Sequence, residues 1–272
     1  MNRIKETFNQ LKKNNKKALG IFLTAGDPDF ESSLNLIQQL PQNGVDFIEI
    51  GMPFSDPMAD GPSIQLSSQR ALKSGMNLIK CLSLVEKFRK LNTHTPIILM
   101  GYYNPIYKFG KEKFIQLCLN SGVDGLIIVD LPPEEDEEFY IEAEKNKLSI
   151  IRLVTPTTNQ KRLNKILFNA TGFVYYVSIT GITGTQAPNV ENVSKNLEKI
   201  KSVTNLPVVI GFGIRSSSQA LSMANISDGI VVGSAVVDLI KSSLDNNDDP
   251  TENSLESCLD FISKVSESVK HN

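Results

Sequence analysis

The chain has 272 residues, of which 40% are hydrophobic and 21% are charged, and its formal net charge is −2. This composition is that of a globular protein with a sizeable core, and it argues against a disordered or collagen-like chain. The balance of 28 basic and 30 acidic residues argues against a broad binding surface for nucleic acid or an anionic membrane. The length fits two average domains or one α/β barrel.

The cysteines and the N-terminal residues indicate the cellular compartment. Cys81, Cys118 and Cys258 are too widely spaced for a disulfide framework or a zinc motif. The first six residues lack the apolar core of a secretory signal. One uncharged stretch, 166–190, has the length of a membrane span, but its glycines and polar residues indicate a buried strand followed by a loop. We therefore expect a cytoplasmic protein without a membrane segment.

Eight short apolar runs recur along the chain, each rich in Val, Ile and Leu, as is typical of parallel strands that are covered on both faces. They are residues 19–24, 47–50, 97–100, 126–129, 150–154, 173–177, 208–210 and 230–232. Amphipathic segments, predicted to be helices, lie between and after these strands. They are residues 30–40, 76–91, 111–120, 134–146, 160–168, 190–203, 217–224, 235–242 and 255–269.

Alternating strands and helices predict either a closed barrel or an open doubly wound sheet. The segment TAGDP at 24–28 follows the first strand where a dinucleotide-binding protein carries G-x-G-x-x-G, which favours closure. We therefore predict an α/β protein with a (β/α)8 TIM barrel as a single domain over 1–272. Its polar segment 242–254 is predicted to connect the barrel to a last helix. The acidic run 134–138 is predicted to be the solvated first turn of a helix.

Glu49 is the most unusual residue of the predicted strands, because it places a carboxylate inside the apolar run FIEIG at 47–51. Removal from water raises the pKa of a carboxyl group unless a cation pairs with it, and Arg152 is the most obvious base in another strand. Catalytic groups of such barrels lie at the C-terminal ends of the strands. Glu49 is therefore a candidate general acid and base, and the alternative is a structural ion pair.

The loop at 52–62, MPFSDPMADGP, is acidic and stiffened by three prolines. Taken singly, Asp56 and Asp60 fit roles in turns or helix caps. If Asp60 faces the same mouth as Glu49, the two form the pair of carboxylates that acid/base chemistry often uses. The two histidines, His94 and His271, offer almost nothing for a catalytic triad or a zinc site.

Two glycine-rich strand ends, VVIGFGI at 208–214 and IVVGSA at 230–235, predict an anion site. Exposed backbone N–H groups and a helix N-terminus suit phosphate, which this fold often binds after its seventh and eighth strands. The alternative is that these glycines form only tight turns. A third glycine-rich loop, at 180–185, is predicted to be a lid.

The stretch DFIEIGMPFSDPMADGPSIQ, which ends at Gln65, resembles the signature of the tryptophan synthase α chain family. FLTAGDP at 22–28, MGYYNP at 100–105, GITG at 181–184 and GFGI at 211–214 resemble the same family, and only 242–272 matches loosely. The resemblance implies a (β/α)8 barrel that cleaves indole-3-glycerol phosphate to indole and glyceraldehyde 3-phosphate. It also implies an α2β2 heterotetramer with a β chain that receives the indole and carries the pyridoxal phosphate, with no cofactor in this chain.

The resemblance implies a role for individual residues. Glu49 matches the general acid and base of the family, Asp60 the carboxylate that meets the indole N–H, and Thr183 a lid residue that hydrogen-bonds Asp60. The positions that match the apolar substrate pocket are Phe22, Met100, Tyr102, Ile127, Leu153, Tyr175 and Phe212. The positions that match the phosphate site are Gly184, Gly213, Gly233 and Ser234.

The sequence differs from the family pattern at a few positions, and two other enzyme functions and a non-enzymatic one are also compatible with it. Met52, Met58 and the lid segment 185–188 differ from the usual pattern. A phosphosugar isomerase or a flavin-binding oxidoreductase would use the region of Gly213 and Ser234 equally well. A catalytically silent barrel that activates a partner is a third possibility, although intact Glu49 and Asp60 argue against it.

Overall fold

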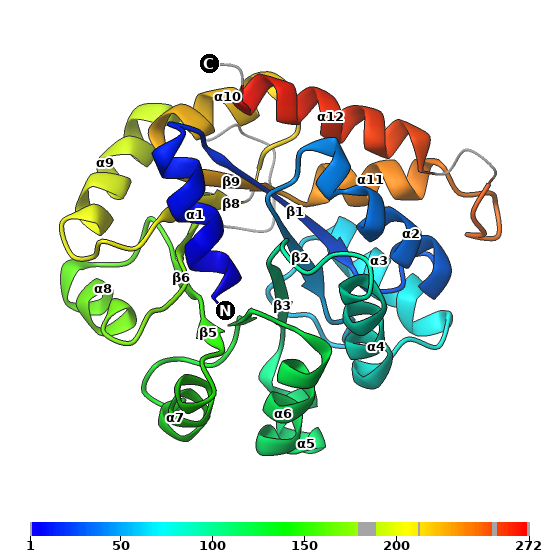
Figure 1. Cartoon of the computed structure of the whole chain (residues 1–272), viewed down its shortest axis with the longest axis horizontal. Helices are drawn as coiled ribbons and strands as arrows, with labels where there is room; N and C mark the ends of the chain where they lie inside the picture. Colours follow the sequence, from blue (N-terminus) through cyan, green and yellow to red (C-terminus); the bar gives the residue numbers. More distant parts are fainter. Residues whose placement is uncertain (1, 179–188, 212, 252–254, 271–272) are drawn as a thin grey trace.

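The computed structural model describes residues 2–178, 189–211, 213–251 and 255–270. Parallel strands form the centre, and helices surround them (Figure 1). The strands are β1 (Ala18–Thr24), β2 (Phe47–Gly51), β3 (Ile97–Gly101), β4 (Gly125–Ile128), β5 (Ser149–Ile150), β6 (Arg152–Val154), β7 (Val174–Val177), β8 (Val208–Gly211) and β9 (Gly229–Val232). Their order in the sheet is β5-β4-β3-β2-β1-β9-β8-β7-β6, which confirms the predicted barrel.

The predicted fifth strand is broken in the structure. Residues 149–150 pair with β4, whereas residues 152–154 pair with β7, so the chain changes its neighbour at Ile151. The N–H of Ile151 donates to the carbonyl of Leu126 at 2.9 Å. Because β5 and β6 are consecutive, this residue joins the two edges of the sheet, and the nine strands act as an eight-stranded barrel.

The helices are α1 (Arg3–Lys13), α2 (Phe30–Gln39), α3 (Pro62–Lys73), α4 (Leu78–Arg89), α5 (Tyr103–Phe109), α6 (Lys111–Ser121), α7 (Glu137–Lys145), α8 (Gln160–Leu167), α9 (Val190–Lys201), α10 (Ser217–Ile226), α11 (Ser234–Ser242) and α12 (Glu256–Lys270). A 3₁₀ turn, η1, follows α2 at Pro41–Asn43. The sequence predicted all of the helices except α1, α3 and α5. Within the described residues, none of them has the length and apolar character of a membrane span.

One predicted helix start is wrong. The helix expected from residue 134 begins at Glu137, because Asp136 is its N-cap and residues 132–135 form a turn. Asp136 is buried and pairs with Arg152, so only part of the acidic run is solvated.

Alternate residues of each strand point into the barrel and fill it. Phe22, Ile98, Met100, Ile127 and Tyr175 belong to this inner cluster. A glycine faces the largest side chains: a Cβ at Gly51 would lie 2.6 Å from the ring of Phe22. The strand starts are covered by α1, whose Ile4, Phe8 and Leu11 join the same cluster. The helix therefore closes that end, and the other end is available for a ligand.

Side-chain caps recur at the starting end of the barrel. In each of four places, a side chain that lies shortly before β2, β4, β7 or β9 accepts the backbone N–H of the first or second residue of an earlier strand. The pairs are Asp46 with Leu19 (2.8 Å), Asp124 with Ile97 (2.8 Å), Thr171 with Ile150 (2.7 Å) and Asp228 with Val208 (2.9 Å). These contacts fix the register between neighbouring strands at the end opposite the predicted site.

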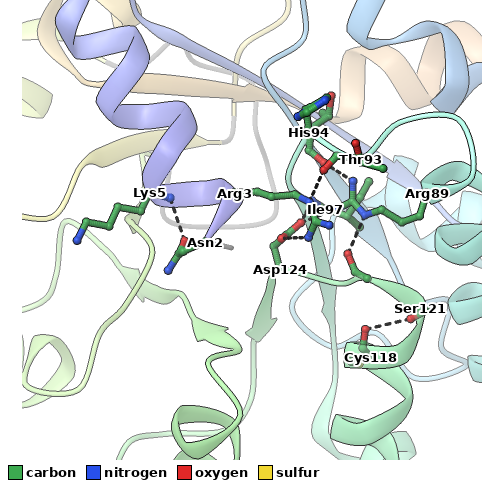
Figure 2. A network of polar contacts seen from close by, with 12 residues as sticks. Asn2, Arg3, Lys5, Arg89, Thr93, His94, Ile97, Cys118, Ser121 and Asp124 are labelled. Atoms are coloured by element: carbon green, nitrogen blue, oxygen red, sulfur yellow. Dashed lines mark hydrogen bonds and ion pairs between the residues drawn. The ribbon is translucent and has the colours of Figure 1, made fainter.

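The cap at Asp124 is the centre of a buried network, shown in Figure 2. Arg3 of α1 donates to one carboxylate oxygen at 2.8 Å, and Arg89 of α4 donates to the other at 2.6 Å. Arg89 also donates to the carbonyls of Thr95 and Gly122. Burial lowers the pKa of Arg89 to about 10, which leaves the guanidinium charged near neutral pH.

Candidate active site

Glu49 lies in the middle of β2, and its side chain points into the barrel, as does that of Phe47, two residues earlier on the same face. The residue is fully buried, and neither carboxylate oxygen has a hydrogen-bond partner among the described residues. Burial raises its pKa to about 8. The carboxyl group is therefore mostly protonated near pH 7 and can donate a proton.

The structural alternative for Glu49, an ion pair with Arg152, does not form. Arg152 follows Ile151, which belongs to the inner cluster, so its side chain points outward from the barrel. There it pairs with Asp136 at the start of α7. Glu49 is thus left as a buried acid without a cation partner in the described part of the chain.

Asp60 lies on the loop between β2 and α3, at the C-terminal end of the barrel. Its backbone is held on both sides: its N–H donates to the carbonyl of Pro57 at 3.1 Å, and its carbonyl accepts the amide of Gln65 at 2.8 Å. Burial raises the pKa of the Asp60 carboxyl to about 6, and a hydrogen bond from the Tyr102 hydroxyl partly offsets this effect. The group is mostly ionised at neutral pH.

A pocket opens beside Asp60 at the ends of the first four strands. Its lining comprises Phe22, Thr24, Gly51, Met52, Asp60, Ile64, Ser68, Met100, Gly101, Tyr102 and Val129. Glu49 precedes the lining residue Gly51 by two positions on the same face of β2, so it lies one layer below the pocket. The two predicted carboxylates are therefore brought to one region of the molecule.

The predicted apolar pocket positions fall into two groups. Phe22, Met100 and Tyr102 line the pocket, whereas Ile127, Leu153 and Tyr175 lie in or against the inner cluster and are not among the lining residues. Phe212, Thr183 and Gly184 lie outside the described residues. Thr24 and Ser68 also line the pocket, and the sequence analysis predicted neither. Ser68 was missed because it lies on α3, a helix that the sequence pattern did not reveal.

Tyr102 connects the loop of Asp60 to the end of β3. Its hydroxyl accepts the N–H of Ala59 at 3.0 Å, and its ring lies 5.4 Å from that of Phe54 on the same loop. Both contacts hold the loop beside the pocket. The sequence offered no signal for this role of Tyr102, because Tyr102 and Ala59 are 43 positions apart and only the fold brings them into contact.

The predicted anion residues lie at the neighbouring strand ends. Gly213 has a φ of 78°, Gly233 is the N-cap of α11, and Ser234 is the first residue of that helix. A Cβ at Gly233 would lie 3.3 Å from the Cβ of Phe22, so the start of α11 adjoins the pocket. The first backbone hydrogen bonds of the helix begin at the N–H of Val236, which leaves the earlier N–H groups for a ligand.

Across the described segments of the chain, no group of three or more His, Cys, Asp or Glu side chains could hold a metal ion.

A sequence model of the family described as "Tryptophan synthase alpha chain" matches residues 8–266. The chain belongs to the tryptophan synthase α chain family. The family assignment confirms the resemblance. It excludes the two rival functions, a phosphosugar isomerase and a flavin-binding oxidoreductase. Enzymes of this family cleave indole-3-glycerol phosphate, and the chain is accordingly a carbon–carbon lyase of tryptophan biosynthesis.

Solved structures agree with the family assignment over nearly full length. Tryptophan synthase subunit alpha from Legionella pneumophila is 37% identical with a TM-score of 0.90, and the match covers 99% of this chain and 98% of that one. A chain from Aquifex aeolicus VF5 is 38% identical with a TM-score of 0.89, over 99% and 100% of the two chains. Tryptophan synthase from Mycobacterium tuberculosis, in an open form with BRD0059 bound, is 29% identical with a TM-score of 0.87, over 99% of each.

Proposed function

We propose that Glu49 and Asp60 carry out the retro-aldol cleavage of indole-3-glycerol phosphate in this chain. The observation that carries this proposal is the position of Glu49, a buried carboxyl group without a partner among the described residues, one layer below a pocket that contains Asp60. Protonated Glu49 donates its proton to C3 of the indole ring. The ring becomes a cationic indolenine, and the Asp60 carboxylate stabilises the positive charge by accepting a hydrogen bond from the indole N–H.

The second half of the reaction returns the proton to Glu49. The bond between C3 and the glycerol carbon breaks, and its electron pair restores the aromatic ring. The hydroxyl group on that same glycerol carbon loses its proton to the Glu49 carboxylate, and the carbon becomes the aldehyde carbon of glyceraldehyde 3-phosphate. Glu49 is thus regenerated, and the products are indole and glyceraldehyde 3-phosphate.

The substrate phosphate binds at Gly213, Gly233 and Ser234 in this proposal, with Gly184 completing the site and Thr183 meeting Asp60 on closure. The start of α11 supplies backbone N–H groups and the positive end of a helix dipole. Because Gly233 adjoins Phe22, a phosphate at the start of α11 would lie next to the pocket that receives the apolar indole, which supports this position.

The partner is a tryptophan synthase β chain, joined in an α2β2 heterotetramer. That β chain, and not this one, holds the pyridoxal phosphate and receives the indole, and the assembly works in the cytoplasm. The loop at 53–62 is the contact surface, because it carries Asp60 and exposes Met58, whose exposed fraction is 83%.

The experiment measures indole release from indole-3-glycerol phosphate by the purified chain, alone and with a β chain. We expect slow release that the β chain accelerates. Glyceraldehyde 3-phosphate should appear in equal amount. Absence of indole under both conditions would exclude the lyase and leave the activating, catalytically silent subunit.

A further inference from the structure

The helix that follows Asp60, α3, is held to the barrel by polar contacts. The residues that it buries are Ser67, Ser68, Arg70 and Ala71, so apolar packing contributes little to its position. Hydrogen bonds and ion pairs fix distance and direction more strictly than contacts between apolar side chains do.

The contacts come from the loop after β1. Arg70 donates twice to Asp27, from Nε to Oδ1 at 2.7 Å and from Nη2 to Oδ2 at 2.8 Å. Their side chains are 7% and 0% exposed. The hydroxyls of Thr24 and Ser67 are hydrogen-bonded at 2.6 Å, and the Ser74 hydroxyl donates to the carbonyl of Gly26 at 3.3 Å. Three residues at the end of β1 and in the loop after it, Thr24, Gly26 and Asp27, therefore fix the position of α3.

Asp60 is attached directly to the start of this helix. It is followed by the N-cap Gly61, and α3 begins at Pro62. The amide of Gln65, in the first turn, donates to the carbonyl of Asp60 at 2.8 Å. Ile64 and Ser68 of the same helix line the same pocket. A shift of α3 would therefore displace the carboxylate and part of the pocket wall together.

We propose that the ion pair between Arg70 and Asp27 positions Asp60, which makes Arg70 a positioning residue for the cleavage reaction. The inference rests on the proposed role of Asp60. The planar guanidinium of arginine fits a carboxylate in a fixed two-bond geometry that lysine cannot reproduce. This geometry holds α3 in one place against the first strand.

The charged surroundings of the two carboxylates are distinct. Arg70, Asp248 and Lys241 act electrostatically on Asp27, and Lys241 also pairs with Asp248. Tyr102 acts on Asp60. A change at Arg70 therefore reaches Asp60 through the position of the helix, and this can be separated from a direct effect of charge by a substitution that keeps the charge.

The first test is Arg70→Lys, with Arg89→Lys as the matched control. Arg89 also holds a buried aspartate, Asp124, but at the opposite end of the barrel. We expect kcat of Arg70→Lys to fall by about 10-fold to 100-fold, as small errors in the placement of a catalytic group do. Arg89→Lys should lose thermal stability and keep kcat.

The second readout does not need the reaction. NMR titration of ¹³C-labelled aspartate, with Asp60→Asn to assign the signal, reports the pKa of Asp60 directly. We expect Arg70→Lys to lower this pKa toward that of an ordinary aspartate, because a displaced loop exposes the carboxyl group to water. Arg89→Lys should leave it unchanged.

A milder variant covers the case in which Arg70→Lys does not fold. Ser67→Ala removes the contact with Thr24 and little volume, and it should lower kcat and the Asp60 pKa in the same direction. If the variants that fold keep the wild-type kcat and Asp60 pKa, the ion pair is structural and the proposal is wrong. If the wild type itself releases no indole, the proposed function fails, while the titration still decides whether Arg70 positions Asp60.

Discussion

The burial of Glu49 makes the stability of the protein depend on pH, because the folded protein disfavours the ionised carboxylate. Its pKa of about 8 in the folded state exceeds the ordinary value of 4.5. Between these two pH values the unfolded chain releases a proton that the folded chain keeps. The free energy of unfolding therefore falls as pH rises through this window, and below pH 4.5 the group has no such effect.

This linkage gives a prediction for the stability of Glu49→Gln. The variant should unfold at a higher temperature than the wild type at pH 7.5, and the difference should shrink toward pH 4.5, because glutamine carries no proton to lose. Thermal unfolding at several pH values measures it, with the exposed Glu86→Gln as control. A difference that grows toward low pH would contradict the assigned direction of the pKa shift.

The same variant should be nearly inactive. A general acid and base contributes about 10²-fold to 10⁴-fold to rate, so Glu49→Gln should lose at least 100-fold in kcat while it remains folded. Asp60→Asn should lose activity likewise, because a neutral amide does not stabilise the indolenine cation. Indole release measures both, and more than a tenth of wild-type turnover in Glu49→Gln would refute its role.

The pH dependence of kcat/KM should be bell-shaped. Asp60 must be ionised, so activity should rise with pH around its pKa of about 6. Glu49 must be protonated, so activity should fall around its pKa of about 8. Asp60→Asn should remove the acidic limb from the residual activity, and an acidic limb that persists in this variant would assign it to another group.

At the scale of the elements, the sequence predicted the strands and most helices because their apolar periodicity is strong. It missed α3 because the buried side of that helix consists largely of serine and arginine. It missed α5 because that helix has seven residues. The break at Ile151 could not be predicted, since it depends on which neighbour each half of the strand pairs with.

In the candidate site, the two carboxylates could be predicted from the sequence, but the contacts that position them could not. Glu49 is recognisable because an acid in an apolar strand is costly, and Asp60 because it follows on the next loop. The contacts that hold Asp60, from Tyr102 and through α3, depend on residues distant in sequence. Only the fold brings them together.

The caps at the strand starts give a prediction for stability. Asp124→Ala leaves the guanidinium groups of Arg3 and Arg89 and the N–H of Ile97 without their acceptor. We expect a loss of about 3–5 kcal/mol in the free energy of unfolding, as for a broken buried ion pair. Denaturant unfolding measures this loss, and Asp238→Ala, at a half-buried residue with a surface ion pair, should cost far less. A loss below 1 kcal/mol for Asp124→Ala would show that the network contributes little.

At the scale of the whole molecule, α1 closes one end of the barrel, and the loop at 53–62 lies at the other, open end. We therefore expect the partner to act at the open end. Docking of a β chain on the loop at 53–62 should fix Asp60 in its productive position and raise the cleavage rate, and reciprocal linkage would signal substrate occupancy back to the β chain. Titration of cognate β chain into the assay measures this. A flat response while the two chains comigrate on gel filtration would exclude activation through this loop.

The side-chain caps divide the strands into four consecutive groups, β1–β2, β3–β4, β5–β7 and β8–β9, since every cap joins the first strand of a group to the segment before its last strand. A break in the backbone between α7 and β5, near residue 147, cuts none of the four caps, since two caps lie wholly in each fragment. A break between α6 and β4, near residue 123, divides Asp124 from Ile97. Complementary fragments made by the first break should therefore reassemble more readily than those made by the second.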